Sequence, residues 1–345
     1  MIISKTPCRL SFAGGGSDIE SYYRENGGAV VSVTIDKYVY LTLQQKFDHR
    51  IRVSYSRVEL VDQVDDIQHP IVRHCLKLLG PQRGIEITSH ADIPSRGSGL
   101  GSSSSFTVGL LNGLYAFHGR HASPQQLAEQ ACHVEIGLCG DPIGKQDQFA
   151  AAFGDLRMYH FHPNGTVKVE PLICRTQTLE RLQQNLLMFY TGIVRSSGDI
   201  LKEQTRVLAQ ERTAIEKMRG IVKHAYAVRH ELENGNPDGV GEILHESWML
   251  KRSLTGGITS PEIDGWYEAA RAAGASGGKI LGAGGGGFLL LYVQQERQAV
   301  VRQALSQLRQ IPFRFENEGS KIVFYNPTTL DAEQGNGKEM PVSGL

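Results

Sequence analysis

A glycine- and serine-rich segment, PSRGSGLGSSSS at residues 94–105, constrains the fold of this chain more than any other feature. Apolar residues at helical spacing follow it at once: Phe106, Leu110, Leu114 and Phe117. Glycines let a backbone turn tightly and approach a ligand, and the first turn of a helix presents N–H groups at its positive end. The segment therefore predicts a loop that binds an anion, and a triphosphate would suit it.

A flexible Gly/Ser linker is the alternative interpretation of residues 94–105. A linker has no need to lead straight into an amphipathic helix, so the pattern favours the anion-binding loop. The loop is not a Walker A motif, because GxxxxGK[ST] occurs nowhere in the chain.

A second glycine-rich segment is PCRLSFAGGGSD at residues 7–18, which predicts a strand, a glycine turn and a helix near residues 19–24. Arg9 is a charged residue in an otherwise apolar strand, and Asp18 could cap the helix. An exposed strand face for Arg9 and a plain N-cap for Asp18 are the simple alternatives. Taken alone, this segment leaves both interpretations open.

The third segment, GAGGGG at residues 282–287, satisfies the pattern GxGxxG. A dinucleotide site requires a strand, the loop and then a helix, within a βαβ unit. Here the loop leads into FLLLYV, which predicts another strand, and no βαβ unit precedes it. We therefore reject a dehydrogenase and expect these glycines to allow the close approach of another backbone or of a ligand.

Three acidic residues lie close together in HVEIGLCGDPIGKQDQ: Glu135, Asp141 and Asp147. Phosphoryl transfer needs a carboxylate for magnesium and often another near the attacking hydroxyl. Acids on helices are usually solvated, which is the alternative for each residue alone. Glu135 borders an apolar stripe and Asp147 precedes an apolar run, so both could face inward, where an acid needs a partner.

The composition argues against several classes of protein. A length of 345 residues fits about two domains, and equal counts of 36 for Lys+Arg and Asp+Glu argue against a nucleic-acid-binding protein. The longest apolar run, at residues 288–293, is too short to cross a membrane, and the N-terminus lacks a signal peptide pattern. Five cysteines without a CxxC pair predict reduced thiols in a cytoplasmic protein, and the histidines lack the spacing of a structural metal site.

The order of predicted elements is that of an α+β protein. Strands are predicted within residues 1–60 and at residues 85–90, 156–161, 186–190, 279–293 and 321–325. Helices are predicted at residues 106–117, at 123–139 with Ser123 as the N-cap, after Asp141, and at residues 199–234, 237–254, 260–273 and 295–309. The polar residues 176–184 suggest a crossing between domains, and residues 327–345 suggest a flexible tail.

The motifs PCRLSFAGGGSD, RGSGLGSSSS and GAGGGGF, in this order and spacing, resemble those of the GHMP kinases over residues 3–325. The resemblance implies a ribosomal-protein-S5-like α/β domain at residues 1–185 and a ferredoxin-like domain at residues 186–326. It also implies an active site in the cleft between the two domains, with ATP and Mg²⁺ as cofactors. The expected partners are a small sugar phosphate and ATP, with a homodimer left open and neither nucleic acid nor membrane expected.

The resemblance implies roles for individual residues as well. Ser103 and Glu135 match the family's magnesium ligands, Asp147 matches the catalytic aspartate of galactokinases, and Arg9 matches the basic residue beside that aspartate. The residues that would bind the nucleotide phosphates are Gly97, Ser98, Gly99, Leu100, Gly101, Ser102, Ser103 and Ser104.

Three further positions match the substrate side of the family's site. Asp18 matches the acid that binds sugar hydroxyls in galactokinases, and Gly144 matches a backbone position next to the sugar. Galactokinases have a Glu-His pair where this chain has Gly15 and Gly16. The loss of those side chains argues against galactose and leaves room for a different or larger sugar.

The segments GGGSD, GKQDQFAAAFG and TGIVRSSGDIL look like the bacterial D-glycero-D-manno-heptose 7-phosphate kinases within this superfamily. That likeness implies phosphorylation of the anomeric hydroxyl to give the 1,7-bisphosphate, on the way to a GDP-activated heptose for surface polysaccharide. An anomeric kinase for fucose or another hexose is one alternative. A regulator that binds sugar and ATP without catalysis is an alternative from another class.

A heptose 7-phosphate would need a second anion site. The basic candidates are Arg195, Lys145, Arg157 and Lys279, each of which could equally be a solvated surface charge. Arg195 is the first choice, because Ser196 and Ser197 follow it and a guanidinium with hydroxyls suits a phosphate.

Overall fold

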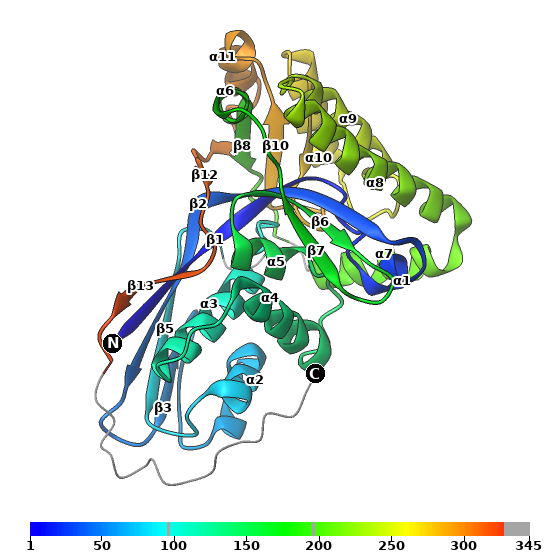
Figure 1. Cartoon of the computed structure of the whole chain (residues 1–345). Coiled ribbons are helices and arrows are strands. Elements are labelled where there is room, and N and C mark those ends of the chain that lie inside the picture. Colours follow the sequence, from blue (N-terminus) through cyan, green and yellow to red (C-terminus); the bar gives the residue numbers. More distant parts are fainter. Residues whose placement is uncertain (95–96, 195–196, 328–345) are drawn as a thin grey trace.

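The structure, a computed structural model, describes residues 1–94, 97–194 and 197–327. Two β-sheets form the frame of the molecule, one of nine strands and one of four, with helices packed against them (Figure 1). The predicted α+β class is confirmed. Within the described ranges, no helix has both the length and the apolar character needed to cross a membrane.

Two long neighbouring strands, β1 (Ile2–Ala13) and β2 (Gly28–Gln45), form the centre of the nine-stranded sheet. The strand order is β13-β1-β2-β5-β3-β4, while β6 and β12 also pair with β2, and β7 pairs with β6. The other strands of this sheet are β3 (Ile51–Ser54), β4 (Val58–Val61), β5 (Ile85–Ala91), β6 (Leu156–Phe161), β7 (Val167–Pro171), β12 (Phe315–Glu316) and β13 (Lys321–Tyr325).

The burial of β2 changes along its length. Residues 29–35 are all buried, whereas residues 39–44 alternate between buried and half-buried positions. Successive side chains of a strand point to opposite faces, so the first half is covered on both faces and the second half on one face only. Helices that pack on the nine-stranded sheet cover this second half.

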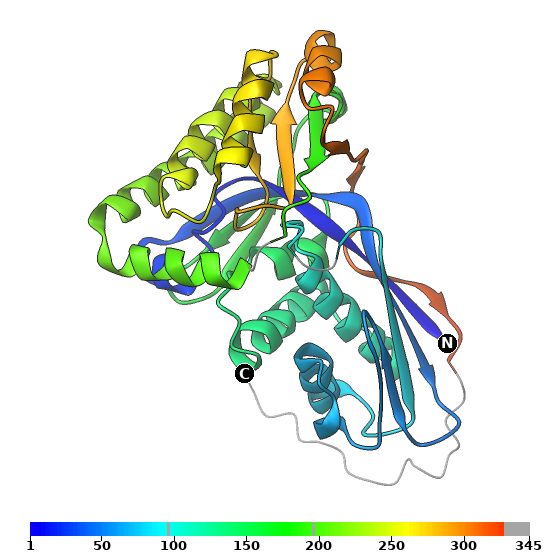
Figure 2. The same cartoon turned by 180° about the vertical axis from the view of Figure 1, so that it is seen from behind.

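Those helices lie on one face of the nine-stranded sheet, with α3 in the middle (Figure 2). The apolar side chains of α3, such as Leu111 and Leu114, share a core with Leu41 and Leu43 of β2. The segments on this side are the 3₁₀ turn η1 (Val64–Asp66), α2 (Pro70–Leu79), α3 (Ser102–Phe117), α4 (Pro124–Cys132), the π-helical η2 (His133–Leu138) and α5 (Gln146–Phe153). Helix α1 (Glu20–Asn26) packs instead against α7 (Ser197–Gln210), as Figure 1 shows.

The four-stranded sheet has the order β11-β8-β10-β9 and is antiparallel throughout. Its strands are β8 (Leu186–Tyr190), β9 (Gly277–Ile280), β10 (Phe288–Tyr292) and β11 (Arg309–Gln310). The surrounding helices are α6 (Thr176–Gln184), α7 (Ser197–Gln210), α8 (Arg212–Glu233), α9 (Gly239–Arg252), α10 (Pro261–Ala272) and α11 (Gln295–Ala304).

One apolar core joins the two sheets. It contains Leu10 and Val33 from the first sheet and Met188 and Leu290 from the second, together with Leu244 of α9. Because burial of apolar surface is the main favourable term in folding, this shared core fixes the two sheets against each other.

Two predicted helix starts are confirmed by their caps. Ser123 accepts a hydrogen bond from the backbone N–H of Gln126 (3.2 Å), and Ser260 accepts one from Ile263 (3.4 Å). In both cases a proline occupies the first helical position, where its missing N–H carries no penalty.

Two other expectations were wrong, and one lacked its secondary structure. Residues 176–184, expected as a crossing between domains, lead from β7 of the first sheet to β8 of the second and form helix α6, with Thr178 and Leu182 buried one helical turn apart. The helix expected at residues 199–234 is two helices, with Glu211 in an extended conformation between them. Asp141 does not begin a helix: α5 starts at Gln146, and the residues between them pack against the loop after β1.

The last part of the chain returns to the first sheet. Strand β13 pairs with β1, with Tyr325 opposite Ile2, and β12 pairs with β2, with Phe315 opposite Ile35. The proposed division at residue 185 stays a prediction. Apart from Pro327, the expected tail at residues 327–345 lies outside the described residues.

The packing of this returning segment can be tested at Gly154, where φ is +68° and an added Cβ would lie 2.2 Å from the backbone N of Gly319. Gly119 has a similar φ of +65° but no atom within 4 Å of such a Cβ. We expect Gly154→Ala to lower the free energy of unfolding by roughly 3 kcal/mol and Gly119→Ala by about 1 kcal/mol, because only the first adds steric overlap to backbone strain. Urea unfolding measures both losses, and equal losses would contradict the packing.

Candidate active site

A cleft of about 1260 Å³ lies where the two sheets meet. Its walls come from the turn after β1, the β3–β4 hairpin, the starts of α2 and α3, residues 141–147, and helices α7 and α9. Two glycine-rich segments also line it. They are called here the first glycine loop (residues 97–101) and the second glycine loop (residues 282–287).

Every second residue of the first glycine loop has a positive φ. Gly97, Gly99 and Gly101 have φ values of +68°, +72° and +74°, a region that side-chain-bearing residues seldom adopt. Helix α3 begins directly after it at Ser102, so the positive end of a 16-residue helix opens into the cleft. This is the geometry of an anion-binding loop, as the sequence predicted.

Ser98 and Leu100 hold the first glycine loop in its conformation. The side chain of Leu100 is buried in the core shared by the two sheets. Its N–H donates to Ser98 Oγ (3.3 Å), and Ser98 Oγ lies 3.2 Å from Ser102 Oγ. Leu100 therefore anchors the loop, while the neighbouring glycines and Ser102, Ser103 and Ser104 line the cleft.

The second glycine loop packs on the first, backbone against backbone. A Cβ on Gly99 would lie 2.3 Å from the carbonyl oxygen of Leu281, and one on Gly287 would lie 2.5 Å from that of Ser98. The loop joins the antiparallel strands β9 and β10. The expectation of a strand–loop–strand segment that allows close backbone approach is confirmed.

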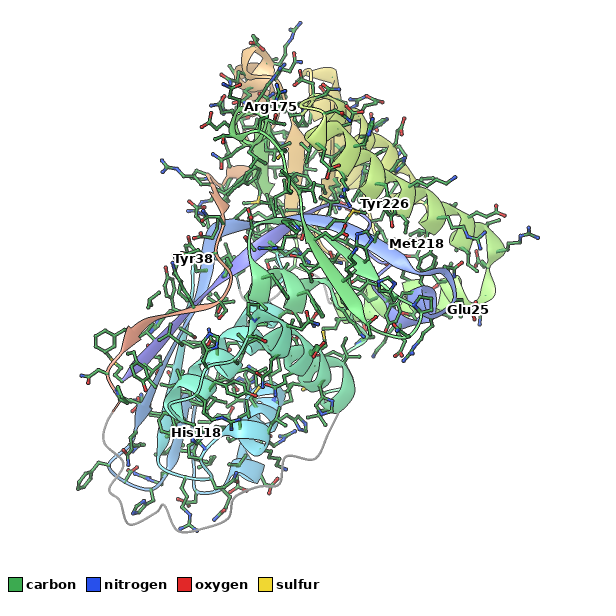
Figure 3. The ribbon with its side chains drawn as sticks, in the orientation of Figure 1. Glu25, Tyr38, His118, Arg175, Met218 and Tyr226 are labelled. Atoms are coloured by element: carbon green, nitrogen blue, oxygen red, sulfur yellow. The ribbon has the colours of Figure 1, made fainter. Side chains whose placement is uncertain are left out.

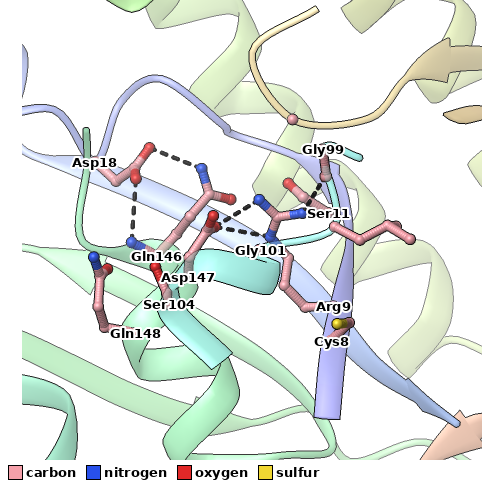
Figure 4. Close-up of polar contacts among 12 residues, drawn as sticks. Cys8, Arg9, Ser11, Asp18, Gly99, Gly101, Ser104, Gln146, Asp147 and Gln148 are labelled. Atoms are coloured by element: carbon pink, nitrogen blue, oxygen red, sulfur yellow. Dashed lines mark hydrogen bonds and ion pairs between the residues drawn. The ribbon is translucent and has the colours of Figure 1, made fainter. Parts of the chain in front are cut away.

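Arg9 and Asp147 form a partly buried ion pair in the cleft (Figure 4). Arg9 Nε and Nη2 both donate to Asp147 Oδ1, at 2.8 Å and 2.6 Å, and Nη1 donates to the carbonyl oxygen of Gly99 at 2.6 Å. The Arg9 side chain is only 4% exposed, whereas that of Asp147 is 25% exposed and faces the cleft. Arg9 thus fixes a carboxylate beside the first glycine loop.

Asp18 lies in the same cleft and is almost completely buried. Its Oδ1 accepts from the N–H of Gly16 (2.9 Å) and from Gln146 Nε2 (3.1 Å), and its Oδ2 accepts from the N–H of Gln146 (3.1 Å). Burial and the charge of Asp147 raise the pKa of Asp18. The simple alternative of an N-cap is excluded, because Ile19 precedes α1 without a side-chain cap and Asp18 accepts from the start of α5 instead.

The glycines around Asp18 differ in how tightly they are packed. A Cβ on Gly144 would lie 1.9 Å from Asp18 Oδ2, so only glycine allows this approach. A Cβ on Gly16 would meet Gln204 Nε2 at 2.4 Å and Met218 Cε at 3.0 Å, and Figure 3 shows Met218 of α8 near this turn. Gly15 has room for a Cβ and is not among the described residues that line the cleft.

Glu135 is completely buried, yet both of its carboxylate oxygens have donors. Ser103 Oγ donates to Oε1 (3.0 Å), while Ser104 Oγ (2.8 Å) and Gln148 Nε2 (2.6 Å) donate to Oε2. Burial raises the pKa of Glu135 to about 7, and the hydrogen bonds oppose that rise. Glu135 lies in the π-helical segment η2, a wider turn that occurs frequently at functional sites.

The pair of Ser103 and Glu135 suits a hard divalent cation. Ser103 is exposed at the mouth of α3 and lines the cleft, and both residues offer oxygen atoms. Magnesium is usually held by one or two carboxylates together with waters and substrate phosphates, so a two-residue donor set is sufficient. The structure brings these two predicted ligands together, and their metal role stays a prediction.

Three residues that the sequence analysis left without a role also line the cleft: Gln146, Gln204 and Lys251. Gln146 Oε1 and both amide atoms of Gln204 are buried and find no hydrogen-bond partner in the described part of the chain. Lys251 lies on the buried face of α9, one turn after Trp248 and two turns after Leu244. A lysine at an apolar-face position was the signal available for it in the sequence.

Of the four candidates for a second anion site, the three that the structure describes do not line the cleft. Arg195 lies outside the described residues. Lys145 donates to the carbonyl oxygen of Gly165 (2.7 Å), Arg157 donates to that of Gly154 (2.7 Å), and buried Lys279 donates to those of Ser11 and Phe12. None of these three described residues lines the cleft.

The far end of the cleft is aromatic. The ring of His69 lies between those of Tyr55 and Phe106, with centroid distances of 4.8 Å and 5.1 Å. Arg57 and His90 line the same region. The cleft therefore combines an aromatic end, the two glycine loops and two acidic residues, Asp18 and Asp147.

Comparison with known proteins agrees with this geometry. Residues 68–155 match the family of GHMP kinases N terminal domains, and residues 228–310 match that of GHMP kinases C terminal domains. The chain belongs to the GHMP kinases. The first glycine loop of this kinase lies in the first matched region and the second glycine loop in the other, so the expected fold is confirmed.

Three similar proteins illustrate the relationship. The chain is 29% identical over 337 residues to a D-glycero-alpha-D-manno-heptose 7-phosphate kinase of Campylobacter jejuni, covering 93% of this chain and 98% of that protein. It is 27% identical to a bifunctional fucokinase/GDP-fucose pyrophosphorylase of Arabidopsis thaliana, covering 80% of this chain and 28% of that protein. The crystal structure of a D-glycero-D-manno-heptose 1-phosphate kinase from Bacteroides thetaiotaomicron superposes with a TM-score of 0.78 at 26% identity, covering 93% of this chain and 98% of that one.

The raised pKa of Glu135 predicts a pH-dependent stability. Its carboxyl ionises near pH 4.5 in the unfolded chain and near pH 7 in the folded protein, so the free energy of unfolding falls as the pH rises from about 4.5 to about 7. We expect Glu135→Gln to remove about 3 kcal/mol of that fall. Urea unfolding at pH 5 and pH 8 without divalent cations measures it, with exposed Glu129→Gln as the control. Parallel profiles for Glu135→Gln and the wild type would contradict the raised pKa.

Proposed function

We propose that this GHMP kinase transfers the γ-phosphoryl group of ATP to the anomeric hydroxyl of D-glycero-D-manno-heptose 7-phosphate. The product would be the 1,7-bisphosphate, a precursor for a GDP-activated heptose of surface polysaccharide. The observation that carries the proposal is the Arg9–Asp147 pair, which faces the cleft beside the first glycine loop. Phosphoryl transfer to a hydroxyl uses an oriented carboxylate at such a position.

The comparisons support a sugar phosphate as the acceptor. Two of the similar proteins carry a heptose phosphate in their names, and both align with nearly their whole length. The two names differ in the position of the phosphate, so the anomeric position is part of our proposal.

The nucleotide would lie along the cleft from its aromatic end to the first glycine loop. The rings of Tyr55, His69 and Phe106 offer apolar surface for a base, and stacking against a base is tolerant of its identity. The glycine backbone and the start of α3 suit the phosphates. Ser103 and Glu135 would hold Mg²⁺, which when bound neutralises charge on the phosphate oxygens.

The acceptor would lie between Asp18 and Asp147. Asp147 would take the proton of the attacking hydroxyl, and the two hydrogen bonds from Arg9 keep its carboxylate in one orientation. The side-chain amide of Gln204 and Oε1 of Gln146, which find no hydrogen-bond partner among the described residues, would bind hydroxyls of the sugar. Because the transition state is loose, alignment and charge neutralisation contribute more than base strength.

A free hexose is the second candidate acceptor. The match to a fucokinase-containing protein over 80% of this chain favours it. A non-catalytic regulator remains the alternative from another class, and the retained ion pair at Arg9 and Asp147 argues against it. Dependence of turnover on the phosphate of the acceptor separates these candidates.

Asp147→Asn keeps the shape of the side chain but removes the proton acceptor. We expect kcat to fall at least 100-fold, with the affinity for ATP changed less than about threefold. Stopped turnover assays and calorimetric titration with MgATP measure the two quantities. Asp155→Asn is the control, because Asp155 lies outside the cleft and its positive φ suits asparagine. A near-normal kcat in Asp147→Asn would contradict the assigned role.

The acceptor can be identified by coupled ADP release with MgATP, comparing D-glycero-D-manno-heptose 7-phosphate, mannose, fucose and galactose. We expect kcat/KM for the heptose phosphate to exceed that of each free hexose at least 100-fold, because the phosphate supplies binding energy that a hexose lacks. Preference for a free hexose would instead identify the protein as an anomeric kinase for that hexose, with the same mechanism. No turnover with any sugar would favour the regulator.

A further inference from the structure

Lys251 is a buried cation in the cleft to which the proposed mechanism gives no role. It is 6% exposed and lies on the face of α9 that carries Leu244 and Trp248. Moving an ammonium out of water is costly unless acceptors replace the lost hydration. A lysine in this position therefore needs a partner that carries negative charge or several oxygen atoms.

The described residues supply that partner only in part. Lys251 Nζ donates to the carbonyl oxygen of Gly282 at 2.6 Å. Among residues 1–94, 97–194 and 197–327, no carboxylate forms an ion pair with it. An ammonium has three N–H donors, so the observed acceptor uses one of them.

The position of Gly282 shows where the other donors can act. A Cβ on Gly282 would lie 2.5 Å from Gly99 Cα, so the two glycine loops touch at this point. Gly99 in turn accepts from Arg9 Nη1 at 2.6 Å. Arg9 from strand β1 and Lys251 from helix α9 therefore bind carbonyl groups of the two contacting loops, Gly99 and Gly282.

The charged groups around Lys251 come from four other elements. They are Asp18 after β1, Arg9 of β1, Asp147 of α5 and Lys279 of β9. Asp18 and Asp147 favour the ammonium form, whereas Arg9, Lys279 and burial oppose it. An anion that enters the cleft between Arg9 and Lys251 would shift this balance toward the charged lysine.

We propose that Lys251 binds the transferring phosphoryl group, with its ammonium on a γ-phosphate oxygen of ATP opposite Arg9; this inference rests on the proposed kinase function. In the reaction the acceptor oxygen forms a bond to the γ-phosphorus, the bond from that phosphorus to the bridging oxygen of ADP breaks, and Asp147 receives the acceptor proton. Lys251 keeps its proton and neutralises the phosphoryl oxygens as their charge is redistributed.

The pH dependence offers a readout that a purely structural lysine would not give. Burial lowers the pKa of Lys251 to about 8 in the ligand-free protein. The ammonium is lost above that pH, so kcat/KM for ATP in the wild type should fall at higher pH. Lys251→Arg retains its charge, so its kcat/KM should stay level to at least pH 9.

The direct test compares calorimetric titrations with MgADP and with MgAMP-PNP, which differ by the γ-phosphoryl group. We expect Lys251→Met and Lys251→Gln to weaken AMP-PNP binding about 10- to 100-fold and ADP binding less than threefold. Lys217→Met is the matched control, because Lys217 also donates to a backbone carbonyl, that of Ser253 at 2.8 Å, but does not line the cleft. Equal effects on both nucleotides, or no effect, would overturn the proposal.

Other outcomes are also decisive. If Lys251→Met unfolds, the isosteric polar Lys251→Gln and the charged Lys251→Arg provide the comparison, with thermal melting as the check on folding. Unchanged AMP-PNP affinity together with weaker binding of the heptose 7-phosphate would assign Lys251 to the acceptor's phosphate and overturn the proposal. Because the titrations contain no acceptor, absence of sugar turnover would count against the proposed function without affecting the result for Lys251.

Discussion

Two glycine-rich loops, one from each sheet, touch backbone to backbone at the floor of the cleft, and the site depends on this contact. Gly99 faces the carbonyl of Leu281, and a Cβ on either Gly99 or Gly282 would overlap the backbone of the other loop. The neighbouring residues Leu100 and Leu281 are both buried in the core that joins the sheets. Apolar burial thus presses the loops together, while their glycines leave carbonyl groups free to bind Arg9 and Lys251.

The site is assembled from groups that are costly to bury. Asp18, Glu135 and Lys251 are all nearly inaccessible, and burial shifts the pKa of each toward the neutral form. Such groups lower the stability of the ligand-free protein and are retained where function requires them. Ligands that bind only the folded state would recover part of this loss. These buried groups therefore suit the cleft to charged ligands but lower the stability of the ligand-free protein.

The sequence predicted those parts of the fold and site that local chemistry determines. Neighbouring residues determine the first glycine loop before α3, the caps at Ser123 and Ser260, and the strand after the second glycine loop. It did not predict the contact between Asp18 and Gln146, or the position of Lys251 beside Gly282, because each joins segments over 30 residues apart. Helix α6 was missed because only two of its side chains are buried.

The return of the chain to its first sheet has a consequence for folding during synthesis. Strand β1 needs β13 on one side, and its residue Ile2 pairs with Tyr325. A nascent chain would leave this edge of β1 unpaired until more than 300 further residues have been translated. An unpaired strand edge can associate with other chains, so β1 is exposed to such association until β13 has been translated.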